Sequence, residues 1–266
     1  MAVLRLIIYQ PQAHYRIPFT FQRRHTYPIP PYSTVIGFLC NACGIDDQNN
    51  ELYSIIKDLK ISISGFFESK TTEMIWFRNI SKTAHEATYG SIFEREKNGQ
   101  IGHIGGQSPM EVDVLHNVEL VIYLYHSQKT KLELLKNLLE RPVDRLQVLH
   151  IGRSEDWIVY RDIMLLEDSD FEYKRQDGHY PYFFWIPQII FLLNEKQICW
   201  DSFDGVPYIV TTFSNIENYE RHHNHTGKRI YKRIEAKLND GRIINAECLF
   251  DKTSNMPVFL GELNGR

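Results

Sequence analysis

Strand and helix periodicities follow one another along the first part of the chain. Apolar runs or alternating positions predict strands at residues 3–9, 60–67, 74–80, 112–125 and 146–151, of which 74–80 is alternatively the rising arm of an insertion. Apolar residues at helical spacing predict helices at residues 33–44, 51–59 and 130–141. This order, with an insertion between the middle strands, is typical of a ferredoxin-like or RNA-recognition-type fold.

The insertion covers residues 81–111 and has little apolar content. Turn signals occur at Asn98-Gly99, Gly102 and Gly105-Gly106. The glycines do not form a phosphate loop, because no Lys-Ser or Lys-Thr pair follows them. A segment of this length without predicted structure is usually functional or mobile. We expect a protruding hairpin with Arg95, Lys97 and His103 near its tip.

After Trp157 the pattern changes almost wholly to strands. Further strands are expected at residues 158–166, 182–193, 206–213, 229–237 and 242–250. The last two flank Asn239-Asp240-Gly241, a strong hairpin signal. Strand periodicity also places five side chains on one face of the strand at 229–237: Arg229, Tyr231, Arg233, Glu235 and Lys237. We therefore expect an α+β protein with a ferredoxin-like domain at 1–160 and a smaller β-rich domain at 161–266.

A proline-rich stretch precedes the first helix. Its prolines, at positions 28, 30 and 31, favour extended backbone before them, so the helix is expected to start after Pro31, with Ser33 as a cap. A helix start leaves backbone N–H groups unpaired at the positive end of the helix dipole, an arrangement that favours a phosphate. The alternative is an ordinary proline-braced helix start. The third helix is expected to begin with a capping box formed by Thr130 and Glu133.

Charge changes this picture locally. The 266 residues carry a formal net charge of −3, so a nucleic-acid-binding surface must be confined to a patch. Residues 12–32 contain no acidic residue and precede the first helix. Their cationic or aromatic members are His14, Arg16, Arg23, Arg24, His25 and Tyr27. This one-sided charge indicates a surface arm suited to an anionic partner, and aromatic residues, 13% of the chain, suit stacking on bases as well as core packing.

Other clusters leave several interpretations open. The four cysteines lack the paired spacing of a zinc site, and we expect buried free thiols. His222, His223 and His225 lie among basic residues, which favours a hydrated basic loop over RNA contact or a metal site. The Gly152-Arg153 turn is either an exposed turn or a phosphate grip. No metal and no cofactor are expected.

Two stretches resemble a known protein family. Residues 27–39 (Tyr-Pro-Ile-Pro-Pro-Tyr-Ser-Thr-Val-Ile-Gly-Phe-Leu), after the opening strand, and residues 149–156 (Leu-His-Ile-Gly-Arg-Ser-Glu-Asp) are similar to landmarks of the CRISPR-associated family numbered five (Cas-five), a branch of the RAMP proteins. The resemblance covers about residues 1–165 and is closest to subtype I-B members. It implies an RNA-recognition-like fold whose protruding thumb hairpin is the insertion at 81–111.

The resemblance also implies a function and a set of partners. Such a subunit of the Cascade antiviral interference complex holds the 5′ handle of CRISPR RNA, contacts the backbone-filament and large subunits, and meets target DNA indirectly. The positions that match the family motifs are Ser33, Thr34, Gly37 and Arg153. Charge and aromatic character add five RNA-binding candidates: Arg16, Arg23, Arg24, His25 and Tyr27.

A metal-independent endoribonuclease that processes precursor CRISPR RNA is the alternative function. Such cleavage needs a proton-transfer group and a cation for the developing phosphorane charge. Candidates are His116, His150, Tyr32 and Lys70. The subtype I-C branch of the resembled family cuts RNA with a Tyr, Lys and His set, but here Asn117 follows His116 and no lysine precedes it. We therefore expect no enzyme activity and a separate processing nuclease as a partner.

A third hypothesis is a small-molecule enzyme on a ferredoxin-like fold, which would bind no repeat-derived RNA.

Cellular location follows from the same sequence. No apolar run approaches the roughly 20 residues that cross a bilayer, and no signal-peptide core is present. We expect a cytoplasmic protein.

Overall fold

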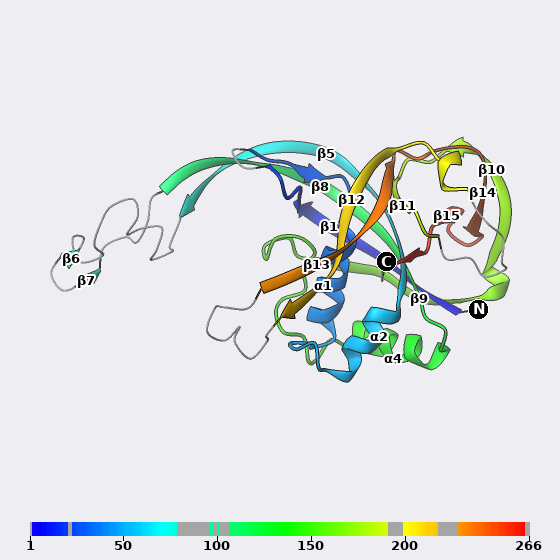
Figure 1. Ribbon diagram of the computed structural model, residues 1–266, viewed down its shortest axis with the longest axis horizontal. Helices are drawn as coiled ribbons and strands as arrows, with labels where there is room; N and C mark the ends of the chain where they lie inside the picture. The colour runs from blue at the N-terminus through cyan, green and yellow to red at the C-terminus, as the bar shows by residue number, and fades with distance from the viewer. Residues whose placement is uncertain are drawn as a thin grey trace.

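The computed structural model describes residues 2–20, 23–78, 96–97, 100–101, 107–190, 199–217 and 228–263. Its centre is a large sheet that contains the strand order β12-β13-β11-β5-β8-β1-β9 (Figure 1). The strands of the first half are β1 (Ala2–Ala13), β5 (Lys60–Arg78), β8 (Gln107–Tyr125) and β9 (Val159–Glu167). The helices are α1 (Tyr32–Ala42), α2 (Glu51–Asp58) and α4 (Lys129–Glu140). The protein is thus a mixed fold in which strands predominate.

The second half of the chain continues the same sheet. Strand β11 (Phe183–Pro187) pairs with β5, and β13 (Lys228–Asn239) lies between β11 and β12 (Val206–Glu217). A separate three-stranded sheet contains β10 (Phe171–His179), β14 (Arg242–Asp251) and β15 (Met256–Val258). The large sheet therefore crosses the expected domain boundary at residue 160, and the division into two domains stays a prediction.

Short elements complete the described structure. They are β2 (Tyr15–Arg16), β3 (Arg23–Arg24), β4 (Thr26–Tyr27), β6 (Glu96–Lys97), β7 (Gln100–Ile101), β16 (Gly261–Glu262) and the 3-10 helices η2 (Asp168–Asp170) and η3 (Trp200–Ser202). Strand β2 pairs with β4, and β3 runs parallel to β8. The described parts of the arm at residues 14–27, which are 14–20 and 23–27, are thus attached to the body rather than free. None of the helices in the described residues is long and apolar enough to cross a membrane.

The two faces of β1 enter different cores because successive strand residues point to opposite sides. Leu4, Leu6 and Ile8 pack with residues of the three helices in the largest core. Val3 faces the other way and packs with Phe171 and other residues of the small sheet. The large sheet is therefore a middle layer, with helices on one face and the small sheet on the other (Figure 1).

Strands β5 and β8 form a long two-stranded ribbon. Their antiparallel register runs from the pair Lys60–Tyr125 to the pair Arg78–Gln107. In Figure 1 the far part of this ribbon extends to the left of the helical layer. Of the expected tip residues, Arg95 and His103 lie outside the described residues, and Lys97 lies in β6, whose side chains are not described.

The expected strand at 146–151 is wrong. Only a single bridge, between His150 and Trp157, forms in this segment. Its backbone is held by Asn41 of α1 instead: the Asn41 side chain accepts from Gln147 N and donates to Val148 O, and the Asn41 carbonyl accepts from Leu146 N. A buried polar side chain thus replaces a strand partner.

The expected hairpin around Asn239-Asp240-Gly241 is also wrong, although both strands exist. Strand β13 pairs with β11 and β12, whereas β14 pairs with β10 and β15. The side chain of Asn239 donates to the carbonyls of Asp204 and Arg242, and Gly241 adopts a φ of +95°. The turn therefore carries the chain from one sheet to another.

Two predicted helix caps are wrong as well. Helix α1 begins at Tyr32, so the N-cap is Pro31 and Ser33 lies in the first turn. Helix α4 begins at Lys129, and His126 Nδ1 accepts a hydrogen bond from the backbone N–H of its N-cap, Gln128. Each helix thus begins before the residue that was expected to cap it, and its N-cap residue has no side-chain hydroxyl.

The four cysteines are free. Cys43 and Cys248 are buried and Cys40 is half-buried, but Cys199 is exposed, contrary to expectation. Burial raises the pKa of the Cys40 thiol to about 11. In the part of the chain that the structure describes, no group of three or more His, Cys, Asp or Glu residues could hold a metal ion. The cluster of His222, His223 and His225 lies outside that part.

Candidate nucleic-acid interface

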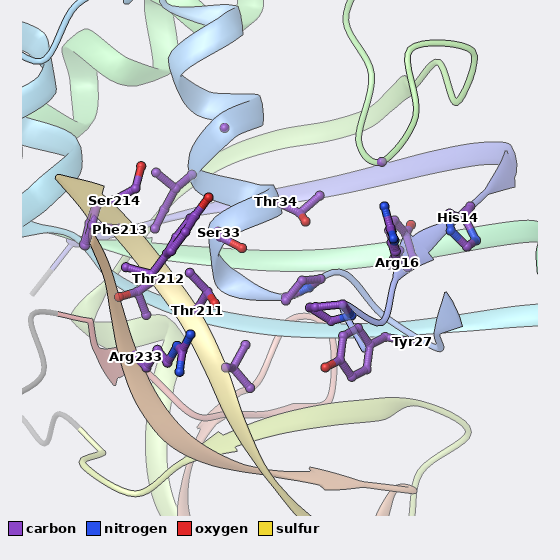
Figure 2. Close-up of a pocket in the computed structure, with 18 of the residues that line it drawn as sticks. His14, Arg16, Tyr27, Ser33, Thr34, Thr211, Thr212, Phe213, Ser214 and Arg233 are labelled. Carbon is purple, nitrogen blue, oxygen red and sulfur yellow. The ribbon is translucent and has the colours of Figure 1, made fainter. Parts of the chain in front are cut away.

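A pocket of about 860 Å³ lies between the start of α1, the arm at 14–27 and strands β12 and β13 (Figure 2). We call it the α1 pocket. Seven of the nine predicted RNA-binding residues line it: Arg16, Arg24, Tyr27, Ser33, Thr34, Gly37 and Arg153. The second half of the chain adds Thr211, Thr212, Phe213, Ser214, Tyr231 and Arg233. The missing candidates are Arg23 and His25.

The start of α1 is held rigidly at the edge of this pocket. Trp185 Nε1 donates to the Pro30 carbonyl at 3.0 Å, and Ile29 and Tyr32 are fully buried. The N–H groups of Thr34 and Val35 donate to the Pro31 carbonyl. The first turn contains no acidic residue. The positive end of the helix dipole is therefore not offset within the helix, which favours an anion there.

Helical periodicity decides which residues of α1 face the pocket. Ser33, Thr34 and Gly37 share one side and line the pocket, whereas Tyr32 and Val35 point into the core. Gly37 is exposed, and a Cβ built on it meets nothing within 4 Å. Two hydroxyls and an open backbone surface are thus presented beside the helix start.

Arg24 brings positive charge into the pocket. Its guanidinium carbon lies 4.6 Å from the centre of the Phe77 ring. Burial, and then the charge of Arg16, lower the pKa of Arg24, although a guanidinium remains protonated. Arg24 Nε is buried and has no hydrogen-bond partner among the described residues. Two arginines near one another, one of them incompletely bonded, favour an anionic ligand.

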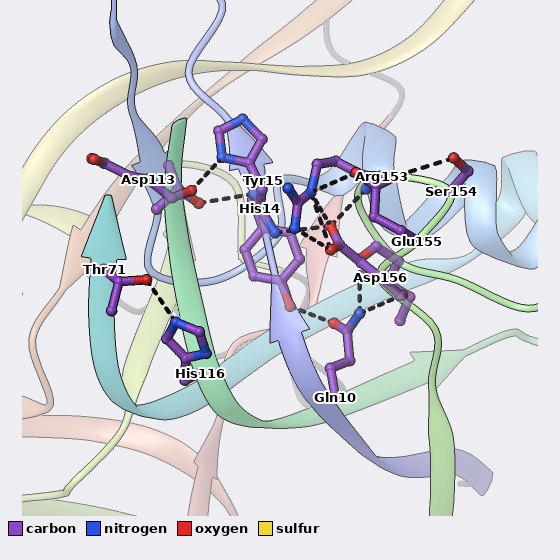
Figure 3. Close-up of polar contacts among 12 residues, drawn as sticks. Gln10, His14, Tyr15, Thr71, Asp113, His116, Arg153, Ser154, Glu155 and Asp156 are labelled. Carbon is purple, nitrogen blue, oxygen red and sulfur yellow. Dashed lines mark hydrogen bonds and ion pairs between the residues drawn. The ribbon is translucent and has the colours of Figure 1, made fainter. Parts of the chain in front are cut away.

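Arg153 is fixed by a buried carboxylate (Figure 3). Its Nη2 donates to Asp156 Oδ1 and its backbone N–H to Asp156 Oδ2, both at 2.8 Å. Asp156 is fully buried and also accepts from the backbone N–H of His14. Burial lowers the pKa of Arg153, but the bond to Asp156 and the negative charges of Asp156, Glu155 and Glu73 together raise it more, so the net direction is upward. Arg153 therefore lines the pocket with its charge partly balanced, and its grip on phosphate stays a prediction.

Gly152 permits this turn. It has a φ of +109°, a region that side chains rarely adopt. A Cβ at this position would lie 2.8 Å from Asp156 Oδ2 and from the His14 carbonyl oxygen. The Gly-Arg turn is thus joined closely to the end of β1.

Arg23 and His25 point away from the α1 pocket and toward Asp113. Arg23 Nη2 lies 2.8 Å from Asp113 Oδ1, and His25 Nδ1 lies 3.0 Å from Oδ2. Burial raises the pKa of Asp113, but bonds from Arg23, His25 and Thr72 and the charge of Lys70 lower it more, to about 2. Since neighbouring residues of β3 project to opposite sides, Arg23 reaches Asp113, whereas Arg24 lines the pocket and packs on Phe77 of the ribbon.

The structure does not bring the alternative catalytic residues together. Tyr32 is fully buried, and burial raises its pKa. His116 Nε2 lies 2.7 Å from Thr71 Oγ1 (Figure 3). Lys70 pairs with Leu115 in the ribbon, one position from His116, so the two side chains leave opposite faces. His150 Nδ1 bonds to the Val148 carbonyl.

Sequence reasoning did not connect the β12–β13 wall to this site. The register changes between Thr211, opposite Arg233, and Ser214, opposite Tyr231, so β12 contains one extra residue. Such a bulge redirects side chains and strengthens local twist. The shared face predicted for Tyr231 and Arg233 was a usable signal, but nothing in the pattern placed it beside α1.

Comparisons with known proteins show the family and the general fold of the chain. A family profile described as CRISPR-associated protein (Cas_Cas5) matches residues 3–237. No curated protein matches the chain. The fold is similar to that of a chain in a "CRISPR RNA-guided surveillance complex", with a TM-score of 0.51, 10% identity and 90% of each chain covered.

Two further solved structures are more distant in shape. One, titled "Crystal structure of Cas protein", has 13% identity, covers 91% of this chain and 98% of its own, and gives a TM-score of 0.43. The other, a CRISPR protein from Archaeoglobus fulgidus, has 13% identity, covers 98% and 92% respectively, and gives a TM-score of 0.39.

Proposed function

This chain belongs to the CRISPR-associated Cas-five family, and on that basis we propose that it is the Cascade subunit that binds the 5′ handle of CRISPR RNA. The observation that carries this proposal is the α1 pocket. It combines a helix start, two neighbouring arginines and hydroxyl side chains in one cavity. The proposal includes a cytoplasmic location and contacts with the backbone-filament and large subunits.

The pocket chemistry fits a single RNA strand. The start of α1, with Arg16 and Arg24, supplies a place for phosphate. Phe19 and Tyr231 line the same pocket with 78% and 49% of their surfaces exposed, so their rings are available to bases. Each stacked base contributes roughly 1–3 kcal/mol. A few such contacts support binding despite the negative net charge of the chain.

The sheet order supports the finer description of the fold. Within the large sheet the order β5-β8-β1-β9, with α1 and α2 between β1 and β5 and α4 between β8 and β9, is that of a ferredoxin-like, RAMP-type unit. We assign the β5–β8 ribbon as the thumb. Its exposed Met74 and Trp76 suit a protein partner, which we propose is the first filament subunit. The subtype I-B assignment belongs to the same proposal.

We propose a binding role without RNA cleavage. This rests on the separation of Tyr32, His116 and Lys70 described above. Incubation of the purified chain with repeat RNA in EDTA tests it: no discrete product is expected. A cut that disappears in His116→Ala would reject this part of the proposal and support the nuclease alternative.

Binding itself is tested with RNA that carries the repeat of the CRISPR array in the same genome. We expect the wild-type chain to bind this RNA, and the double variant Arg16→Ala/Arg24→Ala to bind it at least tenfold more weakly. A matched control is Arg175→Ala/Arg242→Ala, which removes the same charge from exposed positions of the small sheet. Equal losses in both variants would reduce the effect to net charge and reject the α1 pocket as the site.

A further inference from the structure

His14 is a buried residue of the α1 pocket that the proposed function does not yet use. It follows directly after β1, is 5% exposed and lines the pocket. Its Nδ1 lies 2.7 Å from the backbone carbonyl oxygen of Asp113 (Figure 3). The ring is therefore held in one orientation by β8.

This contact decides the tautomer of His14. A carbonyl oxygen only accepts, so Nδ1 must carry the proton and donate it. Burial lowers the pKa of His14, the bond to the Asp113 carbonyl raises it, and the charges of Arg153 and Arg24 lower it again, with a net decrease. The ring is consequently neutral at pH 7, and Nε2 carries a lone pair.

Nε2 has no partner for that lone pair. It is buried and forms no hydrogen bond with any residue that the structure describes. An unsatisfied buried acceptor carries a free-energy cost, so a ligand that donates to it regains free energy. Arg16 and Phe19, which line the same pocket, are exposed side chains, and such side chains change rotamer readily, so this part of the lining can adapt to a ligand.

The missing partner must be a hydrogen-bond donor, which excludes a phosphate oxygen. Given the proposed function, we propose that His14 Nε2 accepts a hydrogen bond from the 2′-hydroxyl of a ribose whose phosphate is bound at the start of α1. The 2′-hydroxyl is a donor that every RNA nucleotide carries near its phosphate whatever its base. DNA lacks this group, so His14 makes the pocket selective for RNA.

The test combines changes in the sugar with changes in the protein. The full-length chain is titrated with the repeat RNA, with a series in which one nucleotide at a time is 2′-deoxy, and with base-substituted strands. Wild-type protein should show one position at which the deoxy change weakens binding about fivefold to tenfold, the effect of a single neutral hydrogen bond. Base changes at that nucleotide should not reproduce the effect.

Two variants separate the atoms of the ring. In His14→Asn the amide N–H₂ replaces the donor to the Asp113 carbonyl but nothing replaces Nε2, so the deoxy effect should disappear. In His14→Gln the longer amide reaches the place of Nε2 and should restore part of it. A deoxy effect that persists in folded His14→Asn would overturn the proposal.

A further readout needs no variant. In nitrogen NMR of wild-type protein labelled at histidine, the resonance of His14 Nε2 should shift when the repeat RNA binds. It should not shift when the strand that is 2′-deoxy at the sensitive position binds. If the protein binds RNA and no deoxy position matters, the role of His14 is rejected while the proposed function stands. If it binds no repeat RNA at all, the proposed function is rejected with it.

Discussion

Arg5 Nη1 donates a hydrogen bond to Asp251 Oδ2 at 2.9 Å, although the two residues are 246 positions apart. Arg5 lies in β1 of the large sheet and Asp251 at the end of β14 in the small sheet. Arg5 is 6% exposed and Asp251 is fully buried. A second bond joins Arg5 Nη2 to Asp162 of β9 at 3.0 Å. This ion pair connects the large sheet to the small sheet that packs against it.

Replacing Arg5 with methionine should destabilise the protein by about 3–5 kcal/mol, because Asp251 would remain buried without its cation. Chemical denaturation of wild type and variant measures the difference. The control is Lys129→Met, which removes an exposed ion pair with Glu167 and should change stability little. Similar effects of both substitutions would show that Arg5 does not connect the layers in the way described.

Acid should destabilise the arm through Asp113. Its folded pKa, about 2, lies below the ordinary value of 3.8. A lowered folded pKa gives stability that is present above 3.8 and is lost as the pH falls through about 2. The contribution is at most about 2 kcal/mol, because Arg23 and His25 are partly exposed to solvent. Denaturation measured at several pH values in this range gives the free energy of unfolding, which should depend less on pH in Asp113→Asn than in wild type. An unchanged pH dependence would contradict the assigned ion pairs.

Gly152→Ala should destabilise the protein by roughly 1–3 kcal/mol. Alanine at this position would have to adopt a strained positive φ, and its Cβ would collide with the Asp156 carboxylate and the His14 carbonyl. Thermal unfolding measures the loss. Gly178→Ala serves as the control, because a Cβ there meets nothing within 4 Å. If Gly152→Ala is as stable as Gly178→Ala, the close approach of the turn to β1 is wrong.

Gly37→Leu should leave the fold intact and weaken RNA binding at least tenfold. The position faces open space in the α1 pocket, so a larger side chain fills the pocket rather than the core. Leucine also favours a helix over glycine by a little under 1 kcal/mol, so the melting temperature should rise slightly. Unchanged RNA affinity in a folded Gly37→Leu would show that the strand does not enter beside α1.

Arg23 and Arg24 should respond differently to alanine substitution, although they are adjacent. Arg24→Ala should weaken RNA binding and reduce the slope of log affinity against log salt by about one unit, as for one lost phosphate contact. Arg23→Ala should mainly destabilise the fold, because Asp113 loses a partner. Titrations at several salt concentrations separate the two. A slope change confined to Arg23→Ala would reverse the assignment.

The sequence was most informative where structure follows from neighbouring residues. The periodicities at residues 3–9, 60–67 and 112–125 predicted strands that are present in β1, β5 and β8. It was misleading at 146–151, where apolar Leu146 and Val148 are exposed and Asn41 holds the backbone. The segment at 239–241 contained a true turn, but side-chain bonds of Asn239 send the following strand into another sheet.

The candidate site divides in the same way. Arg16, Arg24 and Ser33, which line the α1 pocket, were predicted from charge and helix-start signals within a short stretch of chain, and their contact with RNA stays a prediction. Arg23 and His25 could not be told apart from them, because their partner, Asp113, lies far along the chain in β8. The acceptor atom of His14 has no sequence signal at all, since the Asp113 carbonyl selects its tautomer.

The amino-acid sequence by itself determined the proline-stiffened start of α1, the basic arm before it and the strands of the large sheet, because each depends on residues within a few positions of one another. Only the tertiary structure decided that β12 and β13 form the opposite wall of the pocket, and which charges of the arm are neutralised. Those outcomes depend on which distant segments meet in the packed chain, and packing of that kind leaves no periodic trace in the sequence.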